Sequence, residues 1–262
     1  MKPFAVAALL ALAACGSSGA EIGDRSGDDA KSLAAGPCVN AVFEGSRFTH
    51  CIVDPAKAEI ALRLDGADGI PMRSFDRLTE QTPSESILMA MNGGMFNESG
   101  NPIGLYVESG EQRVALNTNE GPGNFHLMPN GVFWGGNGVA HVDTTEHFAT
   151  LEPANPPPFA TQSGPMLLVD GKLHPHFAAD GESKHFRNGV GVDKAGKVHF
   201  VISDDLVSFG RFARFFRDEA KTPDALYLDG AVSALWDPAG GRKDGGPPLG
   251  PLIVVTKQAK AG

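Results

Sequence analysis

The 262-residue sequence has few cysteines, a shortage of basic residues and no apolar segment long enough to cross a membrane as a helix. It contains 22 Lys and Arg against 31 Asp and Glu, a net charge of −9, which does not favour a nucleic-acid-binding surface. The apolar run at 4–14 has 11 residues, whereas a spanning helix needs about 20. Because 42% of the residues are hydrophobic and 20% charged, general disorder is excluded.

Several sequence motifs with known chemistry are missing. There is no HExxH, EF-hand loop or CxxC, and the eight histidines are scattered, so no zinc or calcium site is indicated. Without a GxSxG elbow, an α/β-hydrolase triad is not indicated either. The segment 191–198 resembles a P-loop but ends in Val198 and leads into a strand pattern, so it is predicted to be a hairpin turn.

Glycine and proline are abundant, with 33 and 19 residues, and no collagen-like period is present. This content disfavours long helices and indicates many short strands joined by turns. The chain is long enough for one well-filled core.

Hydrophobic periodicity predicts the elements in more detail. Strands are expected over 60–64, 87–91, 105–107, 225–228 and 252–255, and hairpins over 166–173 and 189–203. Apolar residues at helical spacing predict a helix over 209–220 with Ser208 as its N-cap, and a second, short helix is expected near Arg77. The fold class predicted is α+β: a single β-rich domain with mixed sheets, several hairpins and a few inserted helices.

The N-terminal segment predicts export. Lys2 and the apolar run precede Leu12-Ala13-Ala14-Cys15, which resembles a bacterial lipobox. We expect a lipoprotein signal peptide at 1–14, lipidation at Cys15, a flexible tether at 15–35 and a folded domain at 36–262, on the periplasmic side of the outer membrane. An ordinary signal peptide with a chance cysteine is the alternative.

The two remaining cysteines, Cys38 and Cys51, are 13 positions apart. In an oxidising compartment they are expected to form a disulfide, which would stabilise the fold by about 3 kcal/mol. Two unpaired core cysteines are the alternative.

Polar residues recur where predicted strands end in glycine-containing loops. Such loops expose backbone N–H groups that can bind an anion, although an Asx turn or a strand-end hydrogen bond explains any single member. These residues are Asn92, Gly93, Gly94, Gln162, Ser163, Arg187, Asn188, Asp204, Asp229 and Ser233.

The same blocks carry a resemblance to a known family. NGGMF, GLYVESG, ATQSGPMLLVDGKLHP, RNGVGVDKAGKVHFVISD and ALYLDGAVS resemble the phosphodiester glycosidase domain family, which includes the uncovering enzyme that removes N-acetylglucosamine from a sugar phosphodiester. The resemblance spans about 38–255 and is strongest to a bacterial exported subgroup. It departs from the family at Ala231, where a glycine is usual and where a methyl group could narrow the pocket or exclude a positive φ.

The resemblance implies a hydrolase that cleaves the glycosidic C1–O bond of a sugar phosphodiester. Arg187 would hold the phosphate, with Asp229 as the first carboxylate and Asp204 as the second. Asn92, Gly93, Gly94, Gln162, Ser163, Asn188 and Ser233 would bind the substrate.

Three alternatives stay open at this point. A divalent metal could take the place of the second carboxylate by neutralising phosphate oxygens. The chain could instead be a non-catalytic envelope lipoprotein that binds glycan or cell-wall fragments. A phosphodiesterase that cuts the P–O bond is the third. In each case the partners expected are a small sugar-containing ligand and a membrane, through the lipid anchor.

Overall fold

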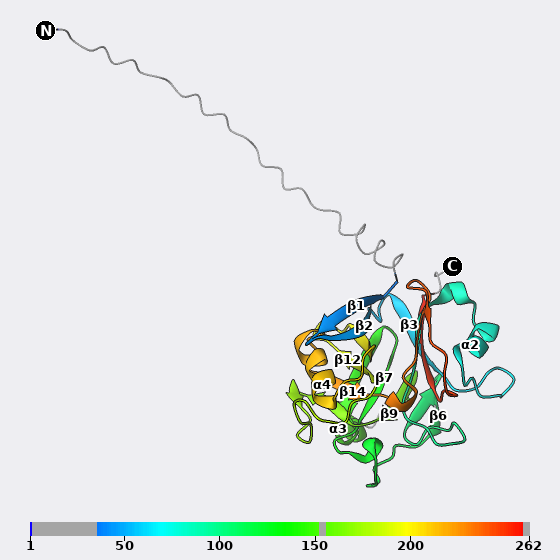
Figure 1. Ribbon diagram of the computed structural model, residues 1–262. Coiled ribbons are helices and arrows are strands. Elements are labelled where there is room, and N and C mark those ends of the chain that lie inside the picture. The colour runs from blue at the N-terminus through cyan, green and yellow to red at the C-terminus, as the bar shows by residue number, and fades with distance from the viewer. Residues whose placement is uncertain (2–35, 152–155, 259–262) are drawn as a thin grey trace.

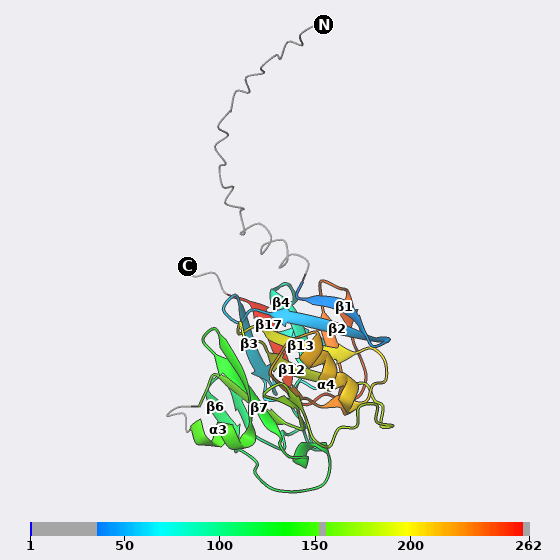
Figure 2. The same cartoon turned by 90° about the vertical axis from the view of Figure 1, so that its left-hand side faces the viewer.

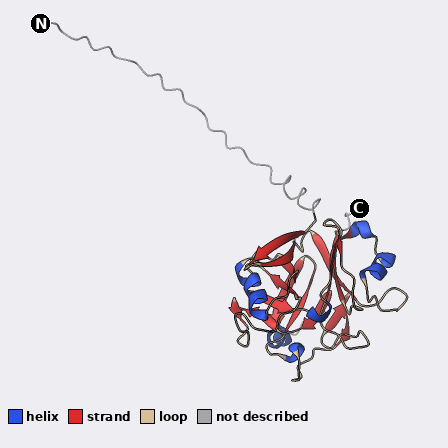
Figure 3. Cartoon of the chain, in the orientation of Figure 1, coloured by secondary structure: helices blue, strands red, loops and turns tan. Residues whose placement is uncertain are grey.

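Three antiparallel sheets surround one central core in the computed structural model, which describes residue 1 and residues 36–151 and 156–258 (Figure 1). The predicted signal peptide, lipidation site and tether therefore lie outside the described residues. Helices lie on the outside of the sheets, as Figure 3 shows by colour. The prediction of a single β-rich α+β domain is confirmed.

The seven-stranded sheet has the order β1-β2-β13-β12-β14-β10-β11. Its inner face contributes to the central core and its outer face is covered by helix α4 (Figure 2). Its strands are β1 (Cys38–Phe43), β2 (Ser46–Val53), β10 (Met166–Val169), β11 (Lys172–Leu173), β12 (Asn188–Val192), β13 (Val198–Ser203) and β14 (Asp224–Tyr227).

The two five-stranded sheets have the orders β16-β15-β4-β17-β3 and β6-β5-β9-β7-β8. The first comprises β3 (Ala58–Arg63), β4 (Ile87–Asn92), β15 (Leu235–Asp237), β16 (Arg242–Lys243) and β17 (Leu252–Lys257). The second comprises β5 (Tyr106–Glu108), β6 (Glu111–Val114), β7 (Gly131–Gly136), β8 (Val139–Thr144) and β9 (Phe159–Ser163).

Three α-helices are found in the described part of the chain, with short 3-10 turns at η1 (Ser84–Ser86), η2 (Asn124–His126) and η3 (Gly230–Val232). Helix α4 (Phe209–Asp218) begins at Ser208, whose side chain accepts a hydrogen bond from the Arg211 N–H at 3.2 Å, as its sequence predicts. Helix α2 (Phe75–Gln81) is the predicted short helix near Arg77. Helix α3 (Thr145–Leu151) was not predicted.

The predicted strands and both predicted hairpins are confirmed. In the first hairpin, β10 and β11 are joined by Asp170 and Gly171, which have φ of 51° and 74°. Two residues with positive φ form the tight turn that suits antiparallel strands, and an Asp-Gly pair adopts it readily. None of the helices in the described residues is long and apolar enough to cross a membrane.

Cys38 and Cys51 are directly opposite each other on β1 and β2 and are joined by a disulfide. Cys51 belongs to the central core, with Cys38 packed against it. The disulfide therefore joins β1, the first strand of the described domain, to β2, its neighbour in the seven-stranded sheet.

Candidate functional site

Polar residues gather at one end of the strands, where β4 and β14 end and β12 begins. Leu228 donates its N–H to the Asn188 carbonyl at 3.0 Å, and Asp229 donates to the Gly93 carbonyl at 3.3 Å. These bonds hold the segment that leaves β14 between the seven-stranded sheet and the sheet of β4. The loop 229–233 begins there.

Two buried asparagines fix the shape of this loop. The Asn92 amide donates to the Asp229 carbonyl at 2.8 Å, and its oxygen accepts from the Asn188 amide and the Ala234 N–H, both at 2.9 Å. The Ser233 hydroxyl lies 3.1 Å from the Gly230 carbonyl and 3.4 Å from the Asn188 side-chain oxygen. Asn92, Asn188 and Ser233 were predicted to bind substrate, but in the structure they support the loop that carries Asp229.

Asp229 is the N-cap of the short η3 turn. Its Oδ1 accepts from the Ala231 N–H at 3.1 Å, and its Oδ2 has no hydrogen-bond partner among the described residues. Burial raises the pKa of the Asp229 carboxyl, and the Ala231 N–H opposes this shift. The free oxygen belongs to a partly desolvated carboxylate, which suits an interaction with developing positive charge.

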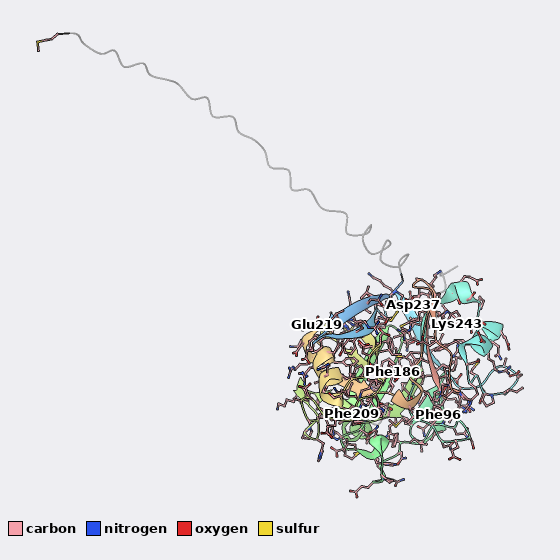
Figure 4. The ribbon with its side chains drawn as sticks, in the orientation of Figure 1. Phe96, Phe186, Phe209, Glu219, Asp237 and Lys243 are labelled. Carbon is pink, nitrogen blue, oxygen red and sulfur yellow. A yellow bond between two sulfur atoms is a disulfide. The ribbon has the colours of Figure 1, made fainter. Side chains whose placement is uncertain are left out.

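Arg187 lies on the floor of a neighbouring cavity of about 210 Å³. We call it the Arg187 cavity; it is lined by Asn124, Ser183, His185, Arg187, Phe209, Tyr227, Gly230 and Ala231. Figure 4 labels Phe209, whose ring lies under the guanidinium with 3.6 Å between the ring centroid and Cζ. The Asp229 loop therefore forms one wall of the cavity.

The Arg187 side chain is 1% exposed and has no carboxylate partner among the described residues. Its Nε donates to the Val207 carbonyl at 2.9 Å and its Nη2 to the Ser183 carbonyl at 3.0 Å. Burial lowers its pKa and the hydrogen-bonded Tyr227 opposes this, but a guanidinium remains charged at any physiological pH. Buried charges are normally paired with an opposite charge, and Arg187 departs from this rule within the described residues.

Tyr227 connects Arg187 with the Asp229 loop. Its hydroxyl interacts with Arg187, and burial raises its pKa. A Cβ placed on Gly230 would collide with the same hydroxyl, so a glycine is required at that position. Sequence reasoning missed Tyr227 and His185, although each lies two positions before a predicted residue, where alternation in an extended segment puts them on the same side.

The methyl group of Ala231 lines the Arg187 cavity. It does not disturb the backbone, because Ala231 is the middle residue of the right-handed η3 turn and not a residue with positive φ. The backbone conformation therefore does not require the glycine that is usual in the family. The expected narrowing of the pocket is limited to the one methyl group that Ala231 adds to the cavity wall.

Gln162 and Ser163 do not reach the cavity. The Gln162 side-chain oxygen accepts from the Leu105 and Asn117 N–H groups, and its amide donates to the Asn117 carbonyl at 2.7 Å and to Thr145 Oγ1 at 3.0 Å. Ser163 is fully buried. Their strand-end position suggested a binding role, but Gln162 is fully used in holding the 103–117 segment against β9.

Gly93 and Gly94 lie in close contact with the protein backbone. A Cβ on Gly94 would come within 2.5 Å of the Gln162 carbonyl oxygen, and one on Gly93 within 3.2 Å of the Pro251 carbonyl oxygen. These glycines allow the strands to approach each other. They are not found among the residues that line the Arg187 cavity.

Asp204 lies elsewhere. Its Oδ1 is 2.6 Å from Arg242 Nη1, and its Oδ2 accepts from Thr49 Oγ1 at 2.9 Å. It lines a second cavity, between β1–β2 and β15–β16, and not the Arg187 cavity. Of the three predicted catalytic residues, the structure brings Arg187 and the Asp229 loop together and leaves Asp204 in an ion pair outside that site.

Residues 85–243 match the phosphodiester glycosidase family. The chain belongs to this family. Both Arg187 and Asp229 lie within the matched region. Among the residues that the structure describes, no group of three or more His, Cys, Asp or Glu side chains is arranged to hold a metal ion.

The chain is also similar to individual proteins over most of its length. The chain is 35% identical over 185 residues to the uncharacterized protein YigE of Escherichia coli, covering 70% of this chain and 72% of that protein. Its fold is similar to that of the catalytic domain of zebrafish N-acetylglucosamine-1-phosphodiester alpha-N-acetylglucosaminidase, with a TM-score of 0.56, 15% identity and 84% and 82% of the two chains covered. A hypothetical protein from Synechocystis gives 0.54 at 15% identity, covering 84% of this chain and 61% of that one.

Proposed function

We propose that this protein is an exported hydrolase that cleaves the C1–O bond of a sugar phosphodiester. The observation that supports this most is the buried Arg187 guanidinium, which lies beside the loop of Asp229 and has no carboxylate partner among the described residues. A phosphodiester would supply the missing anion, and the sugar attached to it would lie toward Asp229. The name of the zebrafish protein describes the same class of substrate.

In the proposed reaction the C1–O bond breaks, its electron pair stays on the phosphate oxygen, and water adds to C1 and releases one proton to the solvent. The products are the free sugar and a phosphomonoester. Arg187 stabilises the charge that develops on the leaving phosphate, because one guanidinium can donate to two phosphate oxygens at once. Asp229 in its ionised form faces the oxocarbenium-like centre.

A phosphate leaving group already bears negative charge well, so it needs a general acid less than an alkoxide does. This fits a site in which Asp229 is the carboxylate and Asp204 is held in an ion pair with Arg242. Asp204 is then a structural residue in the proposal.

The test is hydrolysis of a panel of chromogenic sugar-1-phosphodiesters. The wild type should release sugar, and Asp229→Asn should lose about 10³-fold in kcat/KM because the amide cannot stabilise positive charge. Asp218→Asn, which removes a surface carboxylate paired with Arg217, is the matched control and should keep full activity. Full activity in Asp229→Asn would overturn the assignment.

Two further results would redirect the proposal. Reaction in ¹⁸O-labelled water should label the sugar, whereas label in the phosphate would indicate P–O cleavage. A wild type that turns over no member of the panel but binds glycans would favour the non-catalytic lipoprotein.

Export is a separate part of the proposal and rests on the sequence before residue 36. Labelling with palmitate in a bacterial host should attach to the wild type and be lost in Cys15→Ser. Unchanged labelling in that variant would overturn lipidation at Cys15 without affecting the proposed reaction.

A further inference from the structure

A second cavity of about 540 Å³ lies between the edge strand β1 and the β15–β16 hairpin. We call it the Asp237 cavity; it is lined by Cys38–Val42, Arg47, Phe48, Thr49, Asp204, Asp237, Gly240 and Arg242. Asp237 and Phe209, both labelled in Figure 4, mark this cavity and the Arg187 cavity and lie well apart in that view.

Asp237 is 6% exposed, and neither of its carboxylate oxygens has a hydrogen-bond or ion-pair partner among the described residues. Gly240 is in such close contact with Oδ2 that a Cβ there would collide with it. An ionised carboxylate with no partner is costly to bury. A ligand that donates hydrogen bonds and carries positive charge would remove that cost.

The other charges around the cavity are already paired. Arg47 Nη2 lies 2.7 Å from Asp205 Oδ1. Arg242 Nη1 lies 2.6 Å from Asp204 Oδ1, and its Nη2 lies 2.8 Å from Asp244 Oδ2. With Asp237 included, four carboxylates face two guanidinium groups, a net charge of −2. The surplus negative charge attracts a cation.

The strand edge supplies further polar groups. Ile52 donates its N–H to the Pro37 carbonyl at 2.9 Å, so these two residues form a hydrogen-bonded pair across β1 and β2. By alternation, the backbone N–H and C=O groups of Cys38, Asn40 and Val42 point away from β2. Because β1 is the last strand of its sheet (Figure 1), these groups have no strand partner among the described residues, and the residues that carry them line the cavity.

We propose that the Asp237 cavity binds a sugar that carries a protonated amino group. The ammonium would donate to the Asp237 carboxylate, and the ring hydroxyls, which both donate and accept, would match the alternating N–H and C=O groups of the β1 edge. The cavity is much larger than an ammonium ion alone requires. The site is independent of the proposed hydrolysis at Arg187.

Isothermal titration calorimetry of the full-length protein with glucosamine, glucose and N-acetylglucosamine tests the proposal near neutral pH. Glucosamine should bind about tenfold more tightly than the two neutral sugars, because only its ammonium can pair with Asp237. Equal affinity for the three sugars, or no saturable binding of glucosamine, would overturn the proposal. This comparison uses the wild type alone and does not depend on the folding of any variant.

Asp237→Asn then identifies the residue. It should weaken glucosamine binding by about tenfold and bring it to the level of glucose. Asp205→Asn is the matched control, since it removes the same charge near the same cavity from a carboxylate that is already paired with Arg47. Glucosamine binding unchanged in Asp237→Asn, or reduced equally in Asp205→Asn, would contradict the assignment. The result is separable from the proposed function, because hydrolysis is measured at the other cavity.

Discussion

The Arg187 and Asp237 cavities both contain a buried charge without an oppositely charged partner in the described residues, but the two charges are supported differently. Two carbonyls, a tyrosine hydroxyl and a phenylalanine ring surround Arg187. Asp237 has no such contacts. The dipoles of these groups and the aromatic ring hold the Arg187 guanidinium in a fixed position. A site that stabilises developing negative charge requires such a fixed position. The Asp237 carboxylate lacks such groups, and in our proposal a ligand provides them.

The largest effect is expected from Arg187→Met. It should lower kcat/KM on a sugar phosphodiester by about 10³-fold, since the phosphate would lose the buried cation that lines this cavity. Arg187→Lys should restore only part of the lost kcat/KM, because an ammonium cannot donate to two phosphate oxygens in one plane as a guanidinium does.

Inorganic phosphate provides a control for this prediction that needs no turnover by the variant. It should compete with substrate in the wild type and bind poorly to Arg187→Met. Arg214→Met, which breaks a surface ion pair with Glu44, should leave phosphate binding unchanged. Equal phosphate binding in both variants would show that Arg187 is not the anion site and would remove the difference between the two cavities.

Removing the disulfide should lower the stability of the fold without affecting hydrolysis at the Arg187 cavity. Replacing Cys38 and Cys51 together by Ser should lower the free energy of unfolding by about 3 kcal/mol, as expected for a loop of this size. Urea denaturation measures this. Hydrolysis at 25 °C should remain near the wild-type rate, because Cys38 lines only the Asp237 cavity. Loss of both stability and activity in the folded variant would show that the two regions are coupled.

The pH dependence of hydrolysis should reflect Asp229. Because burial raises the pKa of this carboxyl, protonation should begin at a higher pH than for an ordinary Asp. If the ionised form is active, kcat/KM should fall about tenfold per pH unit on the acid side of that pKa. A rate that rises toward acid pH would instead make Asp229 a proton donor. The profile is read against a thermal unfolding curve at each pH to exclude loss of the fold.

The smallest effect is expected from Asp204→Asn. The side chains of Asp204 and Arg242 are 24% and 27% exposed, so loss of their ion pair should cost about 1 kcal/mol of unfolding free energy. The rate of hydrolysis should stay within a few-fold of the wild type. A loss comparable to that of Asp229→Asn would return Asp204 to the catalytic machinery.

Local pattern was sufficient for nine of the 17 strands in the described residues. Alternating Ile60, Leu62 and Leu64, the apolar run of β4 and the Asp-Gly turn after β10 depend on backbone geometry that neighbouring residues decide. The strands that were not identified are β1, β2, β6, β7, β8, β9, β15 and β16. In β2 and β9 the residues mix polar and apolar side chains that become buried only when the sheets assemble.

The strand-end glycine loops predicted a site at one end of the strands, and the structure places residues of the Asp229 loop in the wall of the cavity that Arg187 lines. Nothing in the sequence distinguished these two residues from Asn92, Asn188 and Gln162, because all are polar residues at strand ends. The difference lies in what each side chain contacts, and those partners are far away along the chain.

The sequence by itself determined the family, the β-rich class, the expectation of export and the residues from which a site could be made. Only the tertiary structure decided which of those residues hold the loop and which remain free for a ligand. Hydrogen bonding within the fold satisfies the Asn and Gln amides and pairs Asp204 with Arg242. Among the described residues it leaves Arg187 without an oppositely charged partner, and it leaves one oxygen of Asp229 and the carboxylate of Asp237 without a hydrogen bond or ion pair.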